Sequence, residues 1–304
     1  MNAPAWSAWQ PLAQWTPSPA VLAETIDGGQ AFRWSRAEAG IYTGQWLDNV
    51  VELRWRDGVV SWRSPPAQHA RAAQSLPRYL GGDTDWTQLT DALPWRSDAH
   101  LARCLAAFPG LRLLRQPFGE TLLGFLCSAT KQIPQIKHML ALLAERHGAP
   151  ISPTCGSEGA RRRHSLPTWA ALACVPEAEL RHCALGFRAR YISETARFLA
   201  AHPTWLDETE AAPYALAKTR LISLPGVGEK VADCVLLFGA GKLEAFPVDT
   251  WILKALARRY GLDGWTPAQL AQFGRAHFGP HAGLAQQYLF SWERQYGRTI
   301  SGAA

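Results

Sequence analysis

Lys230 and Asp249 are the two residues of this chain whose types and spacing best suit joint chemistry. A lysine amine attacks an electrophilic carbon only when it is neutral, so its surroundings must disfavour the ammonium form. Lys230 is expected in the first turn of a helix, where the positive end of the helix dipole and burial both act in that direction. From position alone, a solvated lysine paired with Asp233 is the favoured alternative.

Asp249 stands where residues 246–251 lead into a helix with one apolar face, and this is the position of an N-cap. A cap without any further role is the simplest reading of that position. However, the short connection 239–245 brings this helix start back towards Lys230, so the amine and the carboxylate are expected to face one cleft. Such a pair suits a reaction in which positive charge develops on a sugar carbon.

The turn before Lys230 reads Leu224-Pro-Gly-Val-Gly-Glu-Lys230 and is expected to join two helices in a helix-hairpin-helix at residues 214–238. Gly226 and Gly228 permit close backbone approach. The turn Gly226-Val227-Gly228 and the helix N-terminus after it are suited to bind a phosphate without reading base sequence. A plain corner between two helices is the alternative, which the basic character of the chain disfavours.

The composition is compatible with a polyanionic partner and gives no sign of a metal or cofactor. Lysine and arginine number 31 against 25 acidic residues, a formal net charge of +6, which by itself leaves nucleic-acid binding open. The six cysteines form no Cys-x-x-Cys pair and none lies beyond Cys234, which argues against a zinc ribbon and a C-terminal iron–sulfur cluster. We see neither a secretory signal nor a membrane-spanning run, so we expect a cytoplasmic, nucleoid-associated bacterial protein.

The elements that must position these residues fall into two parts. Three apolar runs separated by Asp-Asn and Asp-Gly pairs predict an antiparallel meander in the first third: Ile41–Trp46, Val50–Trp55 and Val59–Trp62. From about Leu101 onward the apolar spacing is helical. We therefore expect an α+β protein, with an N-terminal antiparallel β domain at 1–112 and a mostly helical domain at 113–304 that contains the hairpin.

The segments Leu224–Cys234 and Pro247–Asp249 resemble the helix-hairpin-helix DNA glycosylases, and more narrowly their 8-oxoguanine DNA glycosylase branch. Four further segments match in order, so that the likeness spans nearly the whole chain: Gly29–Trp34, Leu111–Gln116, Leu185–Tyr191 and Gly283–Phe290. The resemblance implies a bifunctional base-excision-repair glycosylase and AP lyase acting on damaged double-stranded DNA. It implies no cofactor and no obligate protein partner, and we expect a monomer.

The resemblance implies a role for each matched residue. Lys230 would attack C1′ of the damaged nucleoside and form a Schiff base, while Asp249 would stabilise the sugar cation. The Gly29 carbonyl would accept the N7–H that distinguishes 8-oxoguanine from guanine. The base would lie outside the duplex, with its Watson–Crick edge and its two faces contacted by three further residues: Gln286, Phe290 and Cys234. By residue type alone, ordinary packing or a surface position explains Gln286 and Phe290 equally well.

The residues expected to contact the strand gap and the opposite base depart from the family pattern. Thr130-Lys131-Gln132 replaces an asparagine run, and Gln135 replaces an arginine. Phe187 replaces the wedge tyrosine, whereas the following arginine is retained as Arg188. Trp251 stands where a histidine near a phosphate is usual. We expect Thr130, Lys131, Phe187 and Arg188 to contact DNA, with a weakened preference for cytosine opposite the lesion.

Two other functions remain open on the sequence. A monofunctional glycosylase for alkylated bases would use water activated by the aspartate and would not need Lys230. A non-catalytic DNA-binding protein would need only the hairpin. The presence of Lys230, Gly29 and Gln286 argues against the first, and the presence of both Lys230 and Asp249 argues against the second.

Overall fold

The N-terminal part of the chain folds into an antiparallel sheet. The computed structural model describes residues 6–13, 15–37, 39–151 and 163–297. Within these residues the sheet has five strands in the order β1-β5-β4-β3-β2: Gln10–Pro11 (β1), Trp34–Arg36 (β2), Tyr42–Trp46 (β3), Asn49–Arg56 (β4) and Val59–Arg63 (β5). Asp57 and Gly58 have φ values of 52° and 81°, the left-handed pair that a two-residue Asp-Gly hairpin turn requires. The predicted meander is confirmed.

The first third also contains helices that the strand pattern did not predict. They are Pro19–Asp27 (α1), His69–Tyr79 (α2) and Trp86–Asp91 (α3), whereas Ala99–Ala107 (α4) begins close to Leu101, where helical spacing is expected. Side chains from α1 and α2 share one apolar cluster with the sheet, in which the Tyr79 ring stacks on Trp46 at 4.4 Å and its hydroxyl accepts from the Trp34 indole at 3.0 Å. The predicted N-terminal antiparallel sheet is confirmed, and these helices pack against it as additional elements that the strand pattern alone does not indicate.

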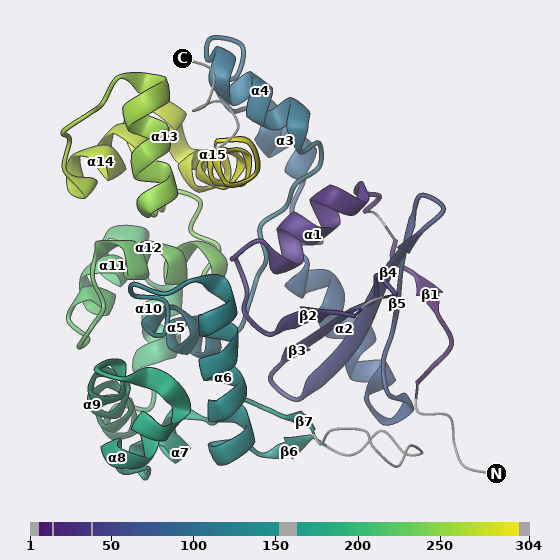
Figure 1. Ribbon diagram of the computed structural model, residues 1–304, viewed down its shortest axis with the longest axis vertical. Helices are drawn as coiled ribbons and strands as arrows, with labels where there is room; N and C mark the ends of the chain where they lie inside the picture. The colour runs from purple at the N-terminus through teal and green to yellow at the C-terminus, as the bar shows by residue number, and fades with distance from the viewer. Residues whose placement is uncertain (1–5, 14, 38, 152–162, 298–304) are drawn as a thin grey trace.

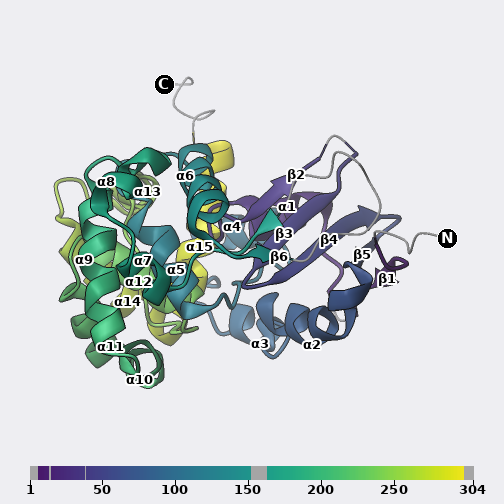
Figure 2. The same cartoon turned by 90° about the horizontal axis from the view of Figure 1, so that it is seen from below.

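The remainder of the described chain is mostly helical, as expected (Figure 1). Its elements are Phe118–Leu126 (α5), Ile133–His147 (α6), Pro150–Ile151 (β6), Arg163–His164 (β7), Trp169–Ala173 (α7), Glu177–Leu180 (α8), Arg188–Ala201 (α9), Trp205–Ala211 (α10), Tyr214–Ile222 (α11), Glu229–Phe238 (α12), Thr250–Tyr260 (α13), Pro267–Phe278 (α14) and Ala282–Tyr296 (α15). Figures 1 and 2 show the sheet on one side of the molecule and most helices on the other. The predicted boundary at residue 112 stays a prediction.

The cysteines and the lengths of the helices can be compared with what the composition predicts. Five of the six cysteines are free thiols, and Cys155 lies outside the described residues. Among the helices described, none has the length and apolar character needed to cross a bilayer.

Candidate active site

The hairpin between α11 and α12 presents backbone rather than side chains. Gly226 has φ +76°, and a Cβ there would lie 2.5 Å from the Tyr191 ring, so only glycine fits. Gly228 is exposed and forms the N-cap of α12 without a capping side chain, so the first amides of α12 lack helical partners. Val227 is buried, and its amide donates to Leu224 O at 3.2 Å. The exposed surface of the hairpin is therefore suited to a phosphate, with Val227 as its internal anchor.

Lys230 lies in the first turn of α12 and is half-buried. Its Nζ donates to Ser128 Oγ at 3.3 Å and lies 5.1 Å from the centre of the Phe125 ring. Asp233 is instead held by Lys218 at 3.0 Å and is 1% exposed. The alternative in which Lys230 is a solvated lysine paired with Asp233 is therefore wrong.

Asp249 is the N-cap of α13, as predicted, and its carboxylate accepts from the amides of Trp251 at 3.0 Å and Ile252 at 2.9 Å. Burial raises the pKa of the Asp249 carboxyl, while the Ile252 amide and the charge of Lys230 oppose that rise. Burial also raises the pKa of the Cys234 thiol to about 12, again opposed by Lys230. The amine of Lys230 and the carboxyl group of Asp249 therefore lie at the starts of two helices, and both act on the neutral thiol of Cys234, one turn further along α12.

Gln286 and Phe290 stand one turn apart on α15, on the side facing Gly29 and the segment before α13. Gln286 is 4% exposed; its Nε2 donates to Pro247 O at 3.2 Å, whereas its buried Oε1 has no partner. A Cβ on Gly29 would lie 3.7 Å from the Phe290 ring and 3.1 Å from Ile133. An unpaired buried acceptor beside an aromatic ring is suited to hold a polar, flat ligand.

The loop that contains Gly29 is fixed by its neighbour Gln30, which the sequence reasoning did not single out. Gln30 is fully buried; its side chain donates to Arg112 O and accepts from Leu114 N, both at 2.9 Å. Its carbonyl accepts from Gln116 Nε2 at 2.7 Å. The position of Gln30 directly before the apolar pair Ala31-Phe32, inside the matched segment Gly29–Trp34, was the available signal, because a polar residue beside buried apolar ones needs buried partners.

Most of the residues expected to contact DNA are exposed near the turn between α5 and α6. Thr130, with φ +55°, and Lys131 lie on that turn and are exposed. Phe187 precedes α9 and is 51% exposed. Gln135 accepts from Gln132 N at 3.1 Å and so completes the start of α6, a role unrelated to base contact.

Arg188 is brought to the same turn but is 2% exposed. Its guanidinium donates to Ala129 O, to Thr130 Oγ1 at 3.0 Å and to Leu185 O at 3.1 Å. In the structure, Arg188 therefore braces the turn from inside the protein.

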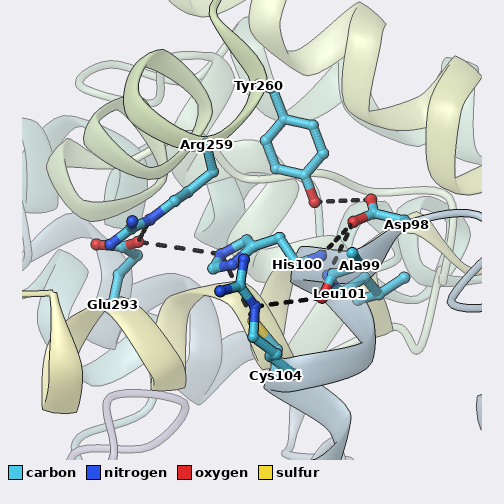
Figure 3. Close-up of polar contacts among 9 residues, drawn as sticks. Asp98, Ala99, His100, Leu101, Cys104, Arg259, Tyr260 and Glu293 are labelled. Carbon is cyan, nitrogen blue, oxygen red and sulfur yellow. Dashed lines mark hydrogen bonds and ion pairs between the residues drawn. The ribbon is translucent and has the colours of Figure 1, made fainter.

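A buried polar cluster joins α4 to the far ends of α13 and α15 (Figure 3). Asp98 caps α4 and accepts from the Tyr260 hydroxyl at 2.8 Å, while Arg259 pairs with buried Glu293 at 3.0 Å. His100 lies between these pairs, 4.0 Å from Glu293. Because Asp249 caps α13 and Gln286 lies on α15, this cluster fixes the two helices that carry them.

We expect the folded protein to lose stability on mild acidification, because the imidazole of His100 is buried in its uncharged form. Burial, followed by the charges of Arg259 and Arg103, lowers the pKa of His100 from 6.5 to about 4. The unfolded chain therefore binds the extra proton first, and stability present above pH 6.5 is lost as the pH falls toward 4. In urea titrations, the free energy of unfolding should fall by about 1–2 kcal/mol more between pH 6.5 and 5 in the wild type than in His100→Asn. Parallel pH dependences would show that His100 does not contribute.

Comparison with known proteins gives consistent matches along the chain. The model of the 8-oxoguanine DNA glycosylase N-terminal domain matches residues 14–122, and that of the HhH-GPD superfamily base excision DNA repair proteins matches residues 124–277. The chain is 31% identical to N-glycosylase/DNA lyase OGG1 of Arabidopsis thaliana over 307 positions, covering 96% of this chain and 82% of that protein. It is 34% identical to the Saccharomyces cerevisiae N-glycosylase/DNA lyase over 61% of this chain and 50% of that protein.

Solved structures show the same likeness. The Clostridium acetobutylicum 8-oxoguanine glycosylase/lyase, in complex with double-stranded DNA containing cytosine opposite 8-oxoG, superposes with a TM-score of 0.83 at 28% identity, covering 96% of this chain and 99% of that one. The 3-methyladenine DNA glycosylase of Archaeoglobus fulgidus has a TM-score of 0.73 at 18% identity, covering 95% of this chain and 99% of that one, and shares the fold.

Proposed function

This chain belongs to the HhH-GPD superfamily of base excision DNA repair proteins and to its 8-oxoguanine DNA glycosylase branch, and we propose that Lys230 and Asp249 carry out its reaction. The protein is a base-excision-repair enzyme, an N-glycosylase/DNA lyase that removes 8-oxoguanine from DNA. The observation that carries the assignment of roles is the placement of Lys230 in the first turn of α12, where its Nζ donates to Ser128 Oγ, and of Asp249 as the N-cap of α13. The charge of Lys230 also acts on the buried Asp249 carboxyl and Cys234 thiol.

In the proposed mechanism, the neutral Lys230 amine attacks C1′ of the flipped nucleoside. The bond from C1′ to the base breaks and the base leaves with its electron pair, while the new C1′–N bond forms and the nitrogen loses a proton. Asp249, as carboxylate, stabilises the positive charge that develops on the sugar. Opening of the sugar ring gives a Schiff base, and elimination of the 3′ phosphate then cuts the strand.

The pocket residues support recognition of the oxidised base. The Gly29 carbonyl accepts the N7–H of 8-oxoguanine, and Gln286 bonds its Watson–Crick edge through the buried oxygen that has no protein partner. Phe290 covers one face of the base and the neutral thiol of Cys234 the other. Each of these contacts is absent when the DNA carries an abasic site.

Replacing Gly29 with alanine is therefore expected to separate the two activities. The φ of +114° and the 3.1 Å approach to Ile133 strain an alanine there and narrow the pocket. Single-turnover release of 8-oxoguanine should slow by about tenfold or more, whereas cleavage of abasic-site DNA should stay within about twofold of wild type. An equal loss on both duplexes would show that Gly29 supports the fold rather than the base.

Discrimination for the opposite base is expected to be weak. The side-chain oxygen of Gln135 is engaged at the start of α6, so this residue offers a cytosine one neutral amide group in place of a guanidinium. Arg188 is buried and donates to Ala129 O, so it does not face a cytosine either. Single-turnover rates opposite A, G and T should fall within about a hundredfold of the rate opposite C. Rates opposite A, G and T that are all slower than that would show that the expectation of weak discrimination is wrong.

The exposed hairpin amides, Lys131 and Phe187 form the proposed contacts with duplex DNA, with Thr130 at the strand gap. We propose that one copy of the chain suffices, since the amine, the carboxylate and the base pocket all come from the same chain. A bacterial cytoplasmic location at the nucleoid is part of this proposal.

The experiment that tests the proposed function compares two lesions in otherwise identical duplexes, 8-oxoguanine and 3-methyladenine. We expect release of 8-oxoguanine with cutting of the strand, and little release of 3-methyladenine. Release of 3-methyladenine alone, without strand cutting, would instead identify a monofunctional glycosylase for alkylated bases.

A further inference from the structure

The turn Ser128–Lys131, here called the gap turn, connects the expected DNA-contacting surface to the Lys230 amine. Its exposed end carries Thr130 and Lys131, whereas its inner end is Ser128, which is 9% exposed. The hydroxyl of Ser128 accepts the hydrogen bond from Lys230 Nζ at 3.3 Å. Six residues, 127–132, separate α5 from α6.

The hydrogen bond that the Ser128 hydroxyl donates fixes the direction from which its oxygen can accept another hydrogen bond. Its hydroxyl proton is donated to Phe125 O at 2.7 Å, so the remaining lone pairs of Oγ are those that face Lys230. The ring of Phe125, on the last turn of α5, lies 5.1 Å from Nζ and is a second contact of the amine. A lysine side chain has many rotamers, and these contacts with α5 select among them.

The gap turn is stabilised by hydrogen bonds within its own backbone and from the buried Arg188. Lys131 N donates to Ser128 O at 3.2 Å, and the left-handed φ of Thr130 closes the turn. Arg188 donates to Ala129 O and Thr130 Oγ1 from a position that is 2% exposed. The position of Ser128 Oγ is therefore fixed by the hydrogen-bonded backbone of the turn as well as by the side-chain rotamer of Ser128.

We propose that Ser128 is a positioning residue for the nucleophile: its hydroxyl aims the Lys230 amine at C1′ and the braced gap turn holds that hydroxyl in place. The inference rests on the proposed role of Lys230. Ser128 touches neither the base nor the sugar in this scheme, so its loss affects the rate of both amine-dependent steps and leaves DNA affinity unchanged. Loss of a residue that only shaped the DNA-binding surface would instead weaken DNA affinity and leave the rates of both steps unchanged.

The test compares Ser128→Thr with Ser128→Val, because the two side chains have the same shape and differ only in the hydroxyl. Any packing strain is thereby shared. We expect Ser128→Val to be slower than Ser128→Thr by about tenfold in single-turnover release of 8-oxoguanine and by a similar factor in borohydride trapping on abasic-site DNA. The dissociation constants for uncleaved lesion duplex should agree within about twofold.

Ser97→Ala serves as the matched control, since Ser97 Oγ also donates to the carbonyl three residues before it, at 3.1 Å, on an exposed turn away from Lys230. Its rates should equal those of the wild type. Equal rates for Ser128→Thr and Ser128→Val, or a difference confined to DNA affinity, would overturn the proposal. A wild type that forms no borohydride adduct would instead overturn the role of Lys230, so the two failures are distinguishable.

Discussion

Replacing Lys230 with glutamine should abolish both base release and strand cleavage while the protein still binds lesion DNA. Glutamine keeps the length and polarity of the side chain but provides no nucleophilic amine, so the step that breaks the glycosidic bond loses its attacking group. We expect the single-turnover rate to fall by at least about 10⁴-fold, equivalent to roughly 5.5 kcal/mol of transition-state stabilisation. Rates are measured on a duplex with 8-oxoguanine opposite cytosine, and affinity by fluorescence anisotropy.

Lys242→Gln is the matched control, because Lys242 lies on the connection after α12 and its hydrogen bonds to Leu236 O and from Ala245 N are made by the backbone, which the substitution keeps. It should retain wild-type rates. A Lys230→Gln protein that loses DNA binding in step with catalysis would point to a structural role for Lys230 and would contradict its proposed role as the nucleophile.

Replacing Asp249 with asparagine should slow base release by about 10²–10³-fold, the cost expected for removing a charge that stabilises a transition state. Asparagine is as good an N-cap as aspartate, so the amides of Trp251 and Ile252 keep their acceptor and α13 keeps its start. The loss should therefore appear in the rate and scarcely in the thermal midpoint.

The pH dependence gives Asp249 a second signature. The carboxylate is the active form, and burial raises the pKa of Asp249 above its usual value of 3.8. The wild-type rate should therefore begin to fall on acidification at a higher pH than an ordinary exposed aspartate would cause, and the Asp249→Asn rate should lack this acid limb. Equal rates and equal pH profiles for the two proteins would leave Asp249 as a helix cap without a catalytic role.

Short sequence motifs predicted the turns and the helix cap, whose geometry depends on residues close together in the chain. The Asp57-Gly58 pair predicts its hairpin, the glycines at 226 and 228 predict the turn, and the residues after Pro247 predict the cap at Asp249. Each depends on neighbouring backbone only. Helices α1 and α2 were missed because the tryptophan-rich, β-like surroundings dominate the pattern and because α2 contains Pro77, a residue that normally interrupts a helix.

Long-range contacts could not be predicted in this way. Ser128 meets Lys230 across 102 positions, and Arg188 meets Ala129 across 59, with no periodic signal linking either pair. Arg188 was expected at the DNA surface because of its place in a matched segment, whereas the structure buries it behind the gap turn. Gly29 and Phe290 were linked by the family resemblance alone, and in the fold the Phe290 ring lies 3.7 Å from the position that a Cβ on Gly29 would take.

The most direct test of Lys230 as the nucleophile is borohydride reduction during the reaction. The protein is incubated with duplex containing 8-oxoguanine opposite cytosine, borohydride is added, and the covalent adduct is isolated and digested for mass spectrometry. We expect DNA attached to the peptide that contains Lys230, and no adduct with Lys230→Gln. An adduct that persists in Lys230→Gln, or a wild type that neither forms an adduct nor releases the base, would contradict the proposed mechanism.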